Sequence, residues 1–259
     1  MTIQDTESGP TRLLDFHTAG IAGLIANRGW HDLSEYERIG AAYDFVRNEI
    51  AFGYNSADDI PASTVLRDGF GQCNTKGTLL MALLRALDIP CRLHGFTILN
   101  SLQRGLVPEV VYPLAPDSIL HSWVEIWHRG RWINLEGFIL DDAVLGALQN
   151  RFADETESLC GYGVGTDCLS KPLVDWRGTD TYVQKTGINA DLGLFENPDE
   201  FYRQHQQSFG RLQGLLYRHL IRHWMNRRVR EMRRGIIHDI PTDGTKSRMN
   251  SRQRKIASV

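Results

Sequence analysis

The stretch that decides the fold is Gly71-Gln72-Cys73-Asn74, followed directly by the apolar segment Thr75 to Leu87. Leucines in this segment recur at spacings of three and four residues, which predicts a helix with one wide buried face. The helix should end before Pro90, because proline cannot continue a helix and the residue before it avoids helical angles. Cys73 is therefore expected in the first turn of a core helix.

This position of Cys73 suits a nucleophile. At a helix N-terminus, unpaired backbone N–H groups and the positive end of the helix dipole favour the thiolate, the reactive form of cysteine. The position also fits a small buried apolar residue, which is the ordinary fate of a free cysteine. As a nucleophile, Cys73 should react as a thiolate well below the pH of about 8.5 at which a free cysteine ionises.

The composition is that of a soluble globular protein, since the 259 residues are 42% hydrophobic and 23% charged. No apolar run reaches membrane-spanning length, and the start MTIQDTESGP lacks the basic and apolar parts of a signal peptide. We therefore expect a cytoplasmic protein with no membrane partner. Cys160 and Cys168 lie in a glycine-rich stretch at a spacing that matches no common metal site, so we expect both to be reduced.

Charge is distributed unevenly along the chain. From Arg211 onward there are 13 Lys and Arg against 3 Asp and Glu, whereas the rest of the chain is acidic. The basic end could bind nucleic acid, fold back on the acidic body, or pair with a second copy through a long amphipathic helix at 211–234. No nucleic-acid-binding motif accompanies it, so nucleic acid is the minority interpretation. The predicted apolar stripe of this helix comprises Leu212, Leu215, Leu216, Leu220 and Trp224.

Strands are predicted at 91–98, 121–127 and 132–135, and the last two form a hairpin. If Arg129 and Gly130 make a two-residue turn, the numbers of paired residues sum to 259. His121 then lies on the same sheet face as Glu136, one diagonal step away, about 7–8 Å apart at the backbone. The register depends on the turn type, since a one-residue slip would reverse the faces.

These residues are the types that nucleophilic catalysis needs. Cys73 would supply the thiolate, His121 would take its proton and later donate one to the leaving group, and Glu136 would orient the imidazole. Taken singly, His121 could be a half-buried strand histidine and Glu136 a solvated carboxylate. The three together favour catalysis.

The same residues resemble the transglutaminase-like superfamily of papain-type cysteine enzymes. The similarity covers roughly residues 35 to 140. It rests on GQC at 71–73, ALLRALDIPCR at 82–92, HSWVEIW at 121–127 and GRWINLE at 130–136. The resemblance implies an α+β fold, with the cysteine-bearing helix packed on an antiparallel sheet. Beyond the resemblance, the chain is expected to continue as a helical C-terminal extension. The expected divisions are 1–33 (an N-terminal helical segment), 34–145 (the catalytic core), 146–240 (a helical extension on the core) and 241–259 (a flexible basic tail).

The resemblance assigns Cys73 as nucleophile and His121 as base, and it places Glu136 where the superfamily usually has aspartate. Asp141 and Asp142 are the alternative carboxylates. The implied oxyanion donors are the Cys73 N–H and a side chain, for which Gln72 and Tyr54 are candidates. No calcium-loop spacing is present, so no cofactor or metal is implied.

The chemistry that follows is acyl transfer through a thioester. The favoured function is a hydrolase of an amide or peptide substrate. The alternatives are a protein-glutamine transglutaminase or another acyltransferase, and a non-enzymatic binding or scaffold module that kept the fold. Reactivity of Cys73 toward iodoacetamide across pH would separate an enzyme from a binding module.

Overall fold

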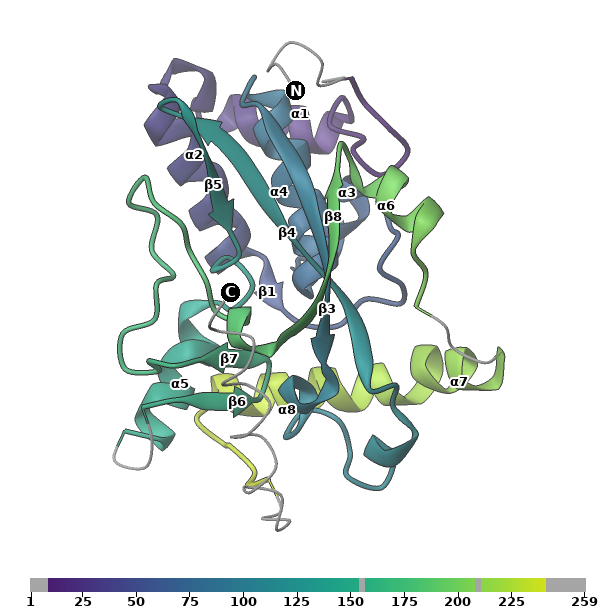
Figure 1. The fold of residues 1–259 in the computed structure, drawn as a ribbon. Coiled ribbons are helices and arrows are strands. Elements are labelled where there is room, and N and C mark those ends of the chain that lie inside the picture. Colours follow the sequence, from purple (N-terminus) through teal and green to yellow (C-terminus); the bar gives the residue numbers. More distant parts are fainter. Residues whose placement is uncertain (1–8, 154–156, 208–210, 241–259) are drawn as a thin grey trace.

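The computed structural model describes residues 9–153, 157–207 and 211–240. At its centre is a four-stranded antiparallel sheet in the order β5-β4-β3-β8. Its strands are β3 (Cys91–Leu99), β4 (Ser118–His128), β5 (Arg131–Leu135) and β8 (Ile188–Phe195). Helix α4 (Cys73–Ala86) packs against the sheet (Figure 1). The predicted α+β architecture, a cysteine-bearing helix on an antiparallel sheet, is confirmed. The tail predicted at 241–259 lies outside the described residues.

Helix α4 is the core of the molecule because it lies between the sheet and the N-terminal helices (Figure 1). Every residue from Asn74 to Arg85 is buried, including the leucines predicted to face inward. Gly77 allows close approach to the sheet, since a Cβ there would already lie 3.5 Å from the Phe138 ring and 3.9 Å from Val124 of β4. The helix ends as predicted, and Asp88 then turns the chain with a positive φ of 58°.

The hairpin of β4 and β5 has the predicted register. Val124 pairs with Leu135 and His128 with Arg131, so the paired numbers sum to 259. Arg129 and Gly130 both have positive φ, at 50° and 81°, which is the conformation of a type I′ turn. This turn matches the twist of the two strands and fixes which side chains share a face.

Three helices precede α4, namely α1 (Ala19–Asn27), α2 (Glu35–Asp44) and α3 (Ala62–Asp68). A capping box of Ser34 and Glu37 begins α2, which continues as a π-turn over Phe45–Glu49. Helix α1 begins only at Ala19. Long-range hydrogen bonds hold the preceding residues out of a helix, because Asp15 accepts from Ser63 and the Leu13 N–H donates to Asp199.

Short strands and helices complete the chain on either side of the sheet. Strands β1 (Ala51–Phe52) and β2 (Phe70–Gly71) pair in parallel, and β6 (Leu159–Gly161) and β7 (Val164–Thr166) form a hairpin in the glycine-rich stretch that contains Cys160. The remaining helices are α5 (Asp142–Arg151), α6 (Pro198–Gln204), α7 (Arg211–Leu216) and α8 (Arg222–Arg233). Asn197 caps α6 by accepting from the Glu200 N–H.

The apolar stripe predicted for the C-terminal helix is wrong at three of its five positions. Leu216 is half-buried and lines the cavity described below, and the side chain of Leu212 lies outside the described residues. Leu215, Leu220 and Trp224 are 53%, 63% and 45% exposed, and the buried residues are instead Met225, Val229 and Met232. The cause is the π-turn at Tyr217–Ile221 between α7 and α8. A π-turn takes an extra residue, so the apolar face after it lies at different positions from those of an uninterrupted α-helix.

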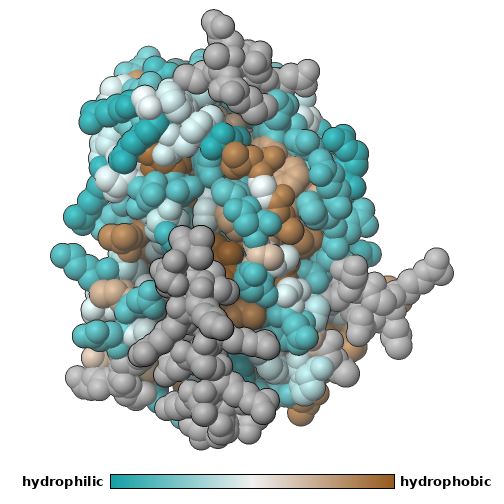
Figure 2. All heavy atoms as spheres, in the orientation of Figure 1, coloured by the Kyte–Doolittle hydropathy of each residue, from teal (hydrophilic) through white to brown (hydrophobic). Residues whose placement is uncertain are grey.

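Hydrophilic residues cover most of the face shown in Figure 2, and apolar side chains gather near its middle, in front of the sheet. Within the described ranges, no helix combines the length and the apolar character that crossing a membrane requires.

Candidate active site

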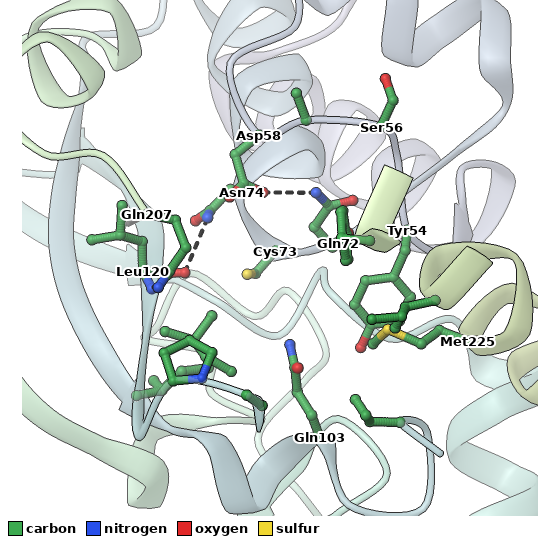
Figure 3. A pocket seen from close by; sticks show the side chains of 18 of the residues that line it. Tyr54, Ser56, Asp58, Gln72, Cys73, Asn74, Gln103, Leu120, Gln207 and Met225 are labelled. Carbon is green, nitrogen blue, oxygen red and sulfur yellow. Dashed lines mark hydrogen bonds between the residues drawn. The ribbon is translucent and has the colours of Figure 1, made fainter. Parts of the chain in front are cut away.

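Cys73 is the first residue of α4, and the pairing of β1 with β2 fixes it there. Phe52 pairs with Gly71 two residues before the cysteine. Gly71 leaves room for the start of the helix, since a Cβ there would lie 2.6 Å from Thr75 Oγ1. Thr75 Oγ1 accepts a hydrogen bond from the Gln72 N–H at 3.1 Å. The half-buried Cys73 side chain consequently points into a pocket (Figure 3).

His121 on β4 meets Glu136, which lies just beyond the end of β5. Both side chains are fully buried, and His121 Nε2 lies 2.9 Å from Glu136 Oε1. Glu136 Oε2 accepts the backbone N–H groups of Val183 at 2.8 Å and Gln184 at 2.9 Å. The carboxylate is therefore held by three hydrogen bonds. Because Nε2 is bound to Glu136, Nδ1 is the ring nitrogen available to Cys73.

The charges at the site favour a protonated His121. Burial alone would lower the pKa of the imidazole. The negative charge of the Cys73 thiolate and hydrogen bonding with it, together with Glu136, outweigh burial and raise the pKa of His121 to about 10. Nδ1 makes no hydrogen bond of ordinary geometry with any described residue, so its contact with Cys73 is loose. Such contacts commonly tighten only when substrate binds.

The raised pKa of His121 predicts a pH-dependent contribution to stability. The folded chain keeps this proton up to about pH 10, whereas an unperturbed histidine loses it near pH 6.5. The stabilisation is therefore complete below about pH 6.5 and is lost as pH rises toward 10. We expect the difference in free energy of unfolding between the unaltered chain and His121→Gln to shrink over this range in urea denaturation.

The free energy of unfolding must be compared between the two chains because Lys76 titrates in the same pH range. Its contribution to stability changes with pH in the opposite direction. Burial lowers the pKa of Lys76 to about 7, so its contribution to stability rises with pH above that value. Both chains contain Lys76, and its effect cancels in the comparison. A difference that stayed constant from pH 6.5 to pH 10 would contradict a protonated His121.

Both side chains predicted as oxyanion donors lie beside Cys73, but their surroundings differ. Gln72 Nε2 donates to Asp58 at 2.7 Å and Gln72 Oε1 accepts from the Asn55 N–H at 2.9 Å, so this side chain holds the segment before α3. The Tyr54 hydroxyl makes no hydrogen bond within the described ranges. Burial raises the pKa of Tyr54 well above its usual value, which keeps the hydroxyl proton in place. Tyr54 is therefore the better placed donor.

A cavity of about 400 Å³ opens beside the Cys73 sulfur (Figure 3). Its wall comes from the segment after β1, from the chain between β3 and β4, and from the C-terminal helix. Most of the wall is apolar and includes Ile98, Leu102, Val107, Leu120, Ile221 and Met225. His121 does not line it. Cys73 thus has an apolar cavity on one side and the imidazole on another.

The alternative carboxylates have other roles. Asp141 caps α5 by accepting from the Val144 N–H and pairs with Arg233, while Asp142 pairs with Arg47. Neither is bonded to His121, so Glu136 is the carboxylate that contacts the imidazole. Across residues 9–153, 157–207 and 211–240, no group of three His, Cys, Asp or Glu side chains could hold a metal ion.

Sequence reasoning missed the parts of the site formed by Val183, Gln184 and the C-terminal helix. The backbone of Val183 and Gln184 fixes Glu136, and the C-terminal helix forms one side of the cavity. Gln103, which also lines the cavity, is the last residue of the 3₁₀ helix Asn100–Gln103 and belongs to no motif. A backbone N–H carries no sequence signal, so only the fold could reveal these contacts.

Residues 26–137 match the family model described as "Transglutaminase-like superfamily". No curated protein matches the chain. Among solved structures, a putative cysteine protease from Cytophaga hutchinsonii is similar over 74% of this chain and 47% of its own, at 14% sequence identity and a TM-score of 0.41. The match therefore spans about half the length of that protein.

Proposed function

We propose that this chain, a member of the transglutaminase-like superfamily through its residues 26–137, is a cysteine-dependent enzyme that transfers acyl groups through a thioester and hydrolyses an amide or peptide bond. The observation that carries the proposal is the convergence of Cys73, His121 and Glu136 from three separate elements beside a cavity. Nucleophile, base and orienting carboxylate are the groups that acyl transfer requires.

In the first half of the reaction, the Cys73 thiolate attacks the carbonyl carbon of the substrate. The carbonyl oxygen becomes an oxyanion, for which the Tyr54 hydroxyl and the Cys73 N–H are the available donors. That N–H belongs to the first turn of α4, where no acceptor exists within the helix. His121 then gives its proton to the leaving nitrogen, the C–N bond breaks, and the acyl group remains on sulfur as a thioester.

In the second half, neutral His121 takes a proton from water as the water oxygen attacks the thioester. The C–S bond breaks, the acid leaves, and the thiolate–imidazolium pair is restored. Glu136 holds Nε2 throughout, so Nδ1 faces the reacting atoms in both steps. Water is the favoured acceptor because it needs no binding site of its own.

The burial of the three groups favours an enzyme over a retired scaffold. Burying charged groups costs free energy unless each is paired. Here His121 and Glu136 are completely buried, and two backbone N–H groups are committed to the carboxylate. A scaffold would gain nothing from this arrangement that apolar residues of similar volume could not supply.

The proposal can be tested by trapping the thioester. We expect p-nitrophenyl acetate to release a burst of p-nitrophenol equal to the amount of protein, and mass spectrometry after acid quenching to find the acetyl group on Cys73. Added methylamine tests the acceptor, since hydrolysis predicts acetate as the main product and a transferase predicts N-methylacetamide. Acetylation of Cys73 no faster than that of the exposed Cys168 would refute the enzyme proposal.

A further inference from the structure

The C-terminal helix is fastened to the backbone beside Cys73, although it lies outside the superfamily match. The Tyr54 N–H donates to Asn226 Oδ1 at 2.7 Å, and Asn226 Nδ2 donates to the Tyr54 carbonyl at 2.9 Å. Arg233 donates to the Phe52 carbonyl at 2.9 Å. These bonds tie α8 to the residues directly after β1, so its distance from the cysteine is set by the fold.

This helix closes the apolar side of the cavity. Ile221 and Met225 line it from the helix, and Leu102 and Val107 line it from the chain between β3 and β4. A cavity of about 400 Å³ with mainly apolar walls is suited to a bulky apolar group of a ligand. Without the helix, one side of the cavity would be missing.

The position of His121 decides which part of the substrate enters the cavity. The acyl group stays on Cys73 after the first step, and the Cys73 sulfur points into the cavity (Figure 3). The leaving nitrogen must lie next to His121, which donates its proton but does not line the cavity. The substituent on the acyl carbon therefore occupies the cavity, and the leaving group departs elsewhere.

Gln103 gives this cavity a polar contact near the sulfur. Its side chain points toward Cys73 (Figure 3), and it makes no hydrogen bond with any described residue. A free carboxamide can donate to a carbonyl and accept from an N–H, so it can bind a peptide group on both sides. In a mainly apolar pocket, a small number of polar groups fixes the orientation of the ligand.

We propose that the cavity is the specificity pocket for a large apolar side chain on the acyl side of the scissile bond. The substrate is then a peptide or N-acylated amino acid, and Gln103 binds its neighbouring amide. This inference rests on the proposed function for the direction of the substrate. It adds the C-terminal helix to the substrate-binding machinery.

The first test compares p-nitrophenyl esters of N-acetylglycine, N-acetylleucine, N-acetylphenylalanine and N-acetyllysine. We expect kcat/KM for the leucine and phenylalanine esters to exceed that for glycine by about 10- to 200-fold, the range that apolar pockets achieve. The lysine ester tests whether Asp58 and Asp59, which also line the cavity, favour a basic side chain over an apolar one. Equal rates for all four esters, or a preference for lysine, would overturn the proposal.

The second test narrows the pocket. Ile221→Trp should lower the phenylalanine-to-glycine ratio of kcat/KM at least about 10-fold. Leu220→Trp is the matched control, because Leu220 is the adjacent residue and is 63% exposed. The ratio should not change in this control.

Gln103→Ala adds no volume to the cavity. It should raise KM for the phenylalanine ester and for the glycine ester. Unchanged values in Ile221→Trp and Gln103→Ala would exclude this pocket.

Binding to Cys73→Ala separates the pocket from the chemistry. Calorimetry should detect N-acetylphenylalanine amide at concentrations at which N-acetylglycine amide does not bind. Such binding without acylation of the unaltered chain would support the pocket and refute the proposed function. Acylation of the unaltered chain with no binding preference would support the function and refute the pocket.

Discussion

Replacement of Cys73 by alanine is expected to lower turnover of an activated ester by at least about 10⁴-fold, because the variant has no atom that can form the thioester. The fold should remain intact. Cys73 is only half-buried at the first turn of α4, and its side chain faces a cavity rather than the core. Steady-state turnover and urea denaturation of the same preparation would measure both quantities.

The other cysteines provide matched controls for this experiment. Cys168 is exposed and far along the chain from the site, so Cys168→Ala should retain turnover within about twofold. Burial raises the pKa of Cys91 to about 11, which makes it a poor nucleophile near neutral pH. Undiminished turnover in Cys73→Ala would show that the reacting group lies elsewhere, and turnover lost only in Cys168→Ala would identify that group.

Local sequence patterns predicted the elements that carry the three reacting groups. The leucine spacing located the helix of Cys73, and the two-residue turn at Arg129 and Gly130 gave the strand register. From the register came the proximity of His121 and Glu136, which the 2.9 Å distance confirms. Such patterns succeed where the interaction is set by a few neighbouring residues, as in a helix face or a tight turn.

The surroundings of the site could not be predicted because they depend on contacts distant in sequence. Strand β8 pairs with β3 about a hundred residues away, and its mixed burial lacks a clear alternation. The π-turn at Tyr217–Ile221 shifts the face of the C-terminal helix, so its inward residues fall outside the regular spacing. The start of α1 likewise depends on a contact distant in sequence, because Asp15 accepts a hydrogen bond from the Ser63 N–H.

Glu136→Gln is expected to lower kcat by about 10²- to 10⁴-fold. In the unaltered chain, one carboxylate oxygen accepts two backbone N–H groups and the other faces His121 Nε2. The side chain of glutamine has one oxygen and one NH₂ group. The oxygen must face the two backbone N–H groups, because an NH₂ group in that place would set a donor against two other donors. The NH₂ group must then face His121, and Nε2 must become an acceptor.

That change selects the wrong form of the imidazole. With Nε2 accepting, the ring proton sits on Nδ1, and neutral His121 cannot take a proton from the thiol or from water. The loss of the negative charge also removes one of the causes that raise the pKa of His121. Iodoacetamide labelling of Cys73 near pH 6 should therefore slow together with kcat, which a purely structural effect of the substitution would not produce.

A second histidine–glutamate pair on the sheet gives the control. Glu125 lies on β4 like His121 and contacts His94 Nδ1 at 2.6 Å, as well as Arg92. Glu125→Gln should leave kcat within a few fold, because this pair neither lines the cavity nor contacts Cys73. Equal losses in both variants would mean that the sheet tolerates neither change and that Glu136 has no special role. A loss confined to Glu136→Gln, with labelling of Cys73 slowed in parallel, would show that this carboxylate sets the proton on His121.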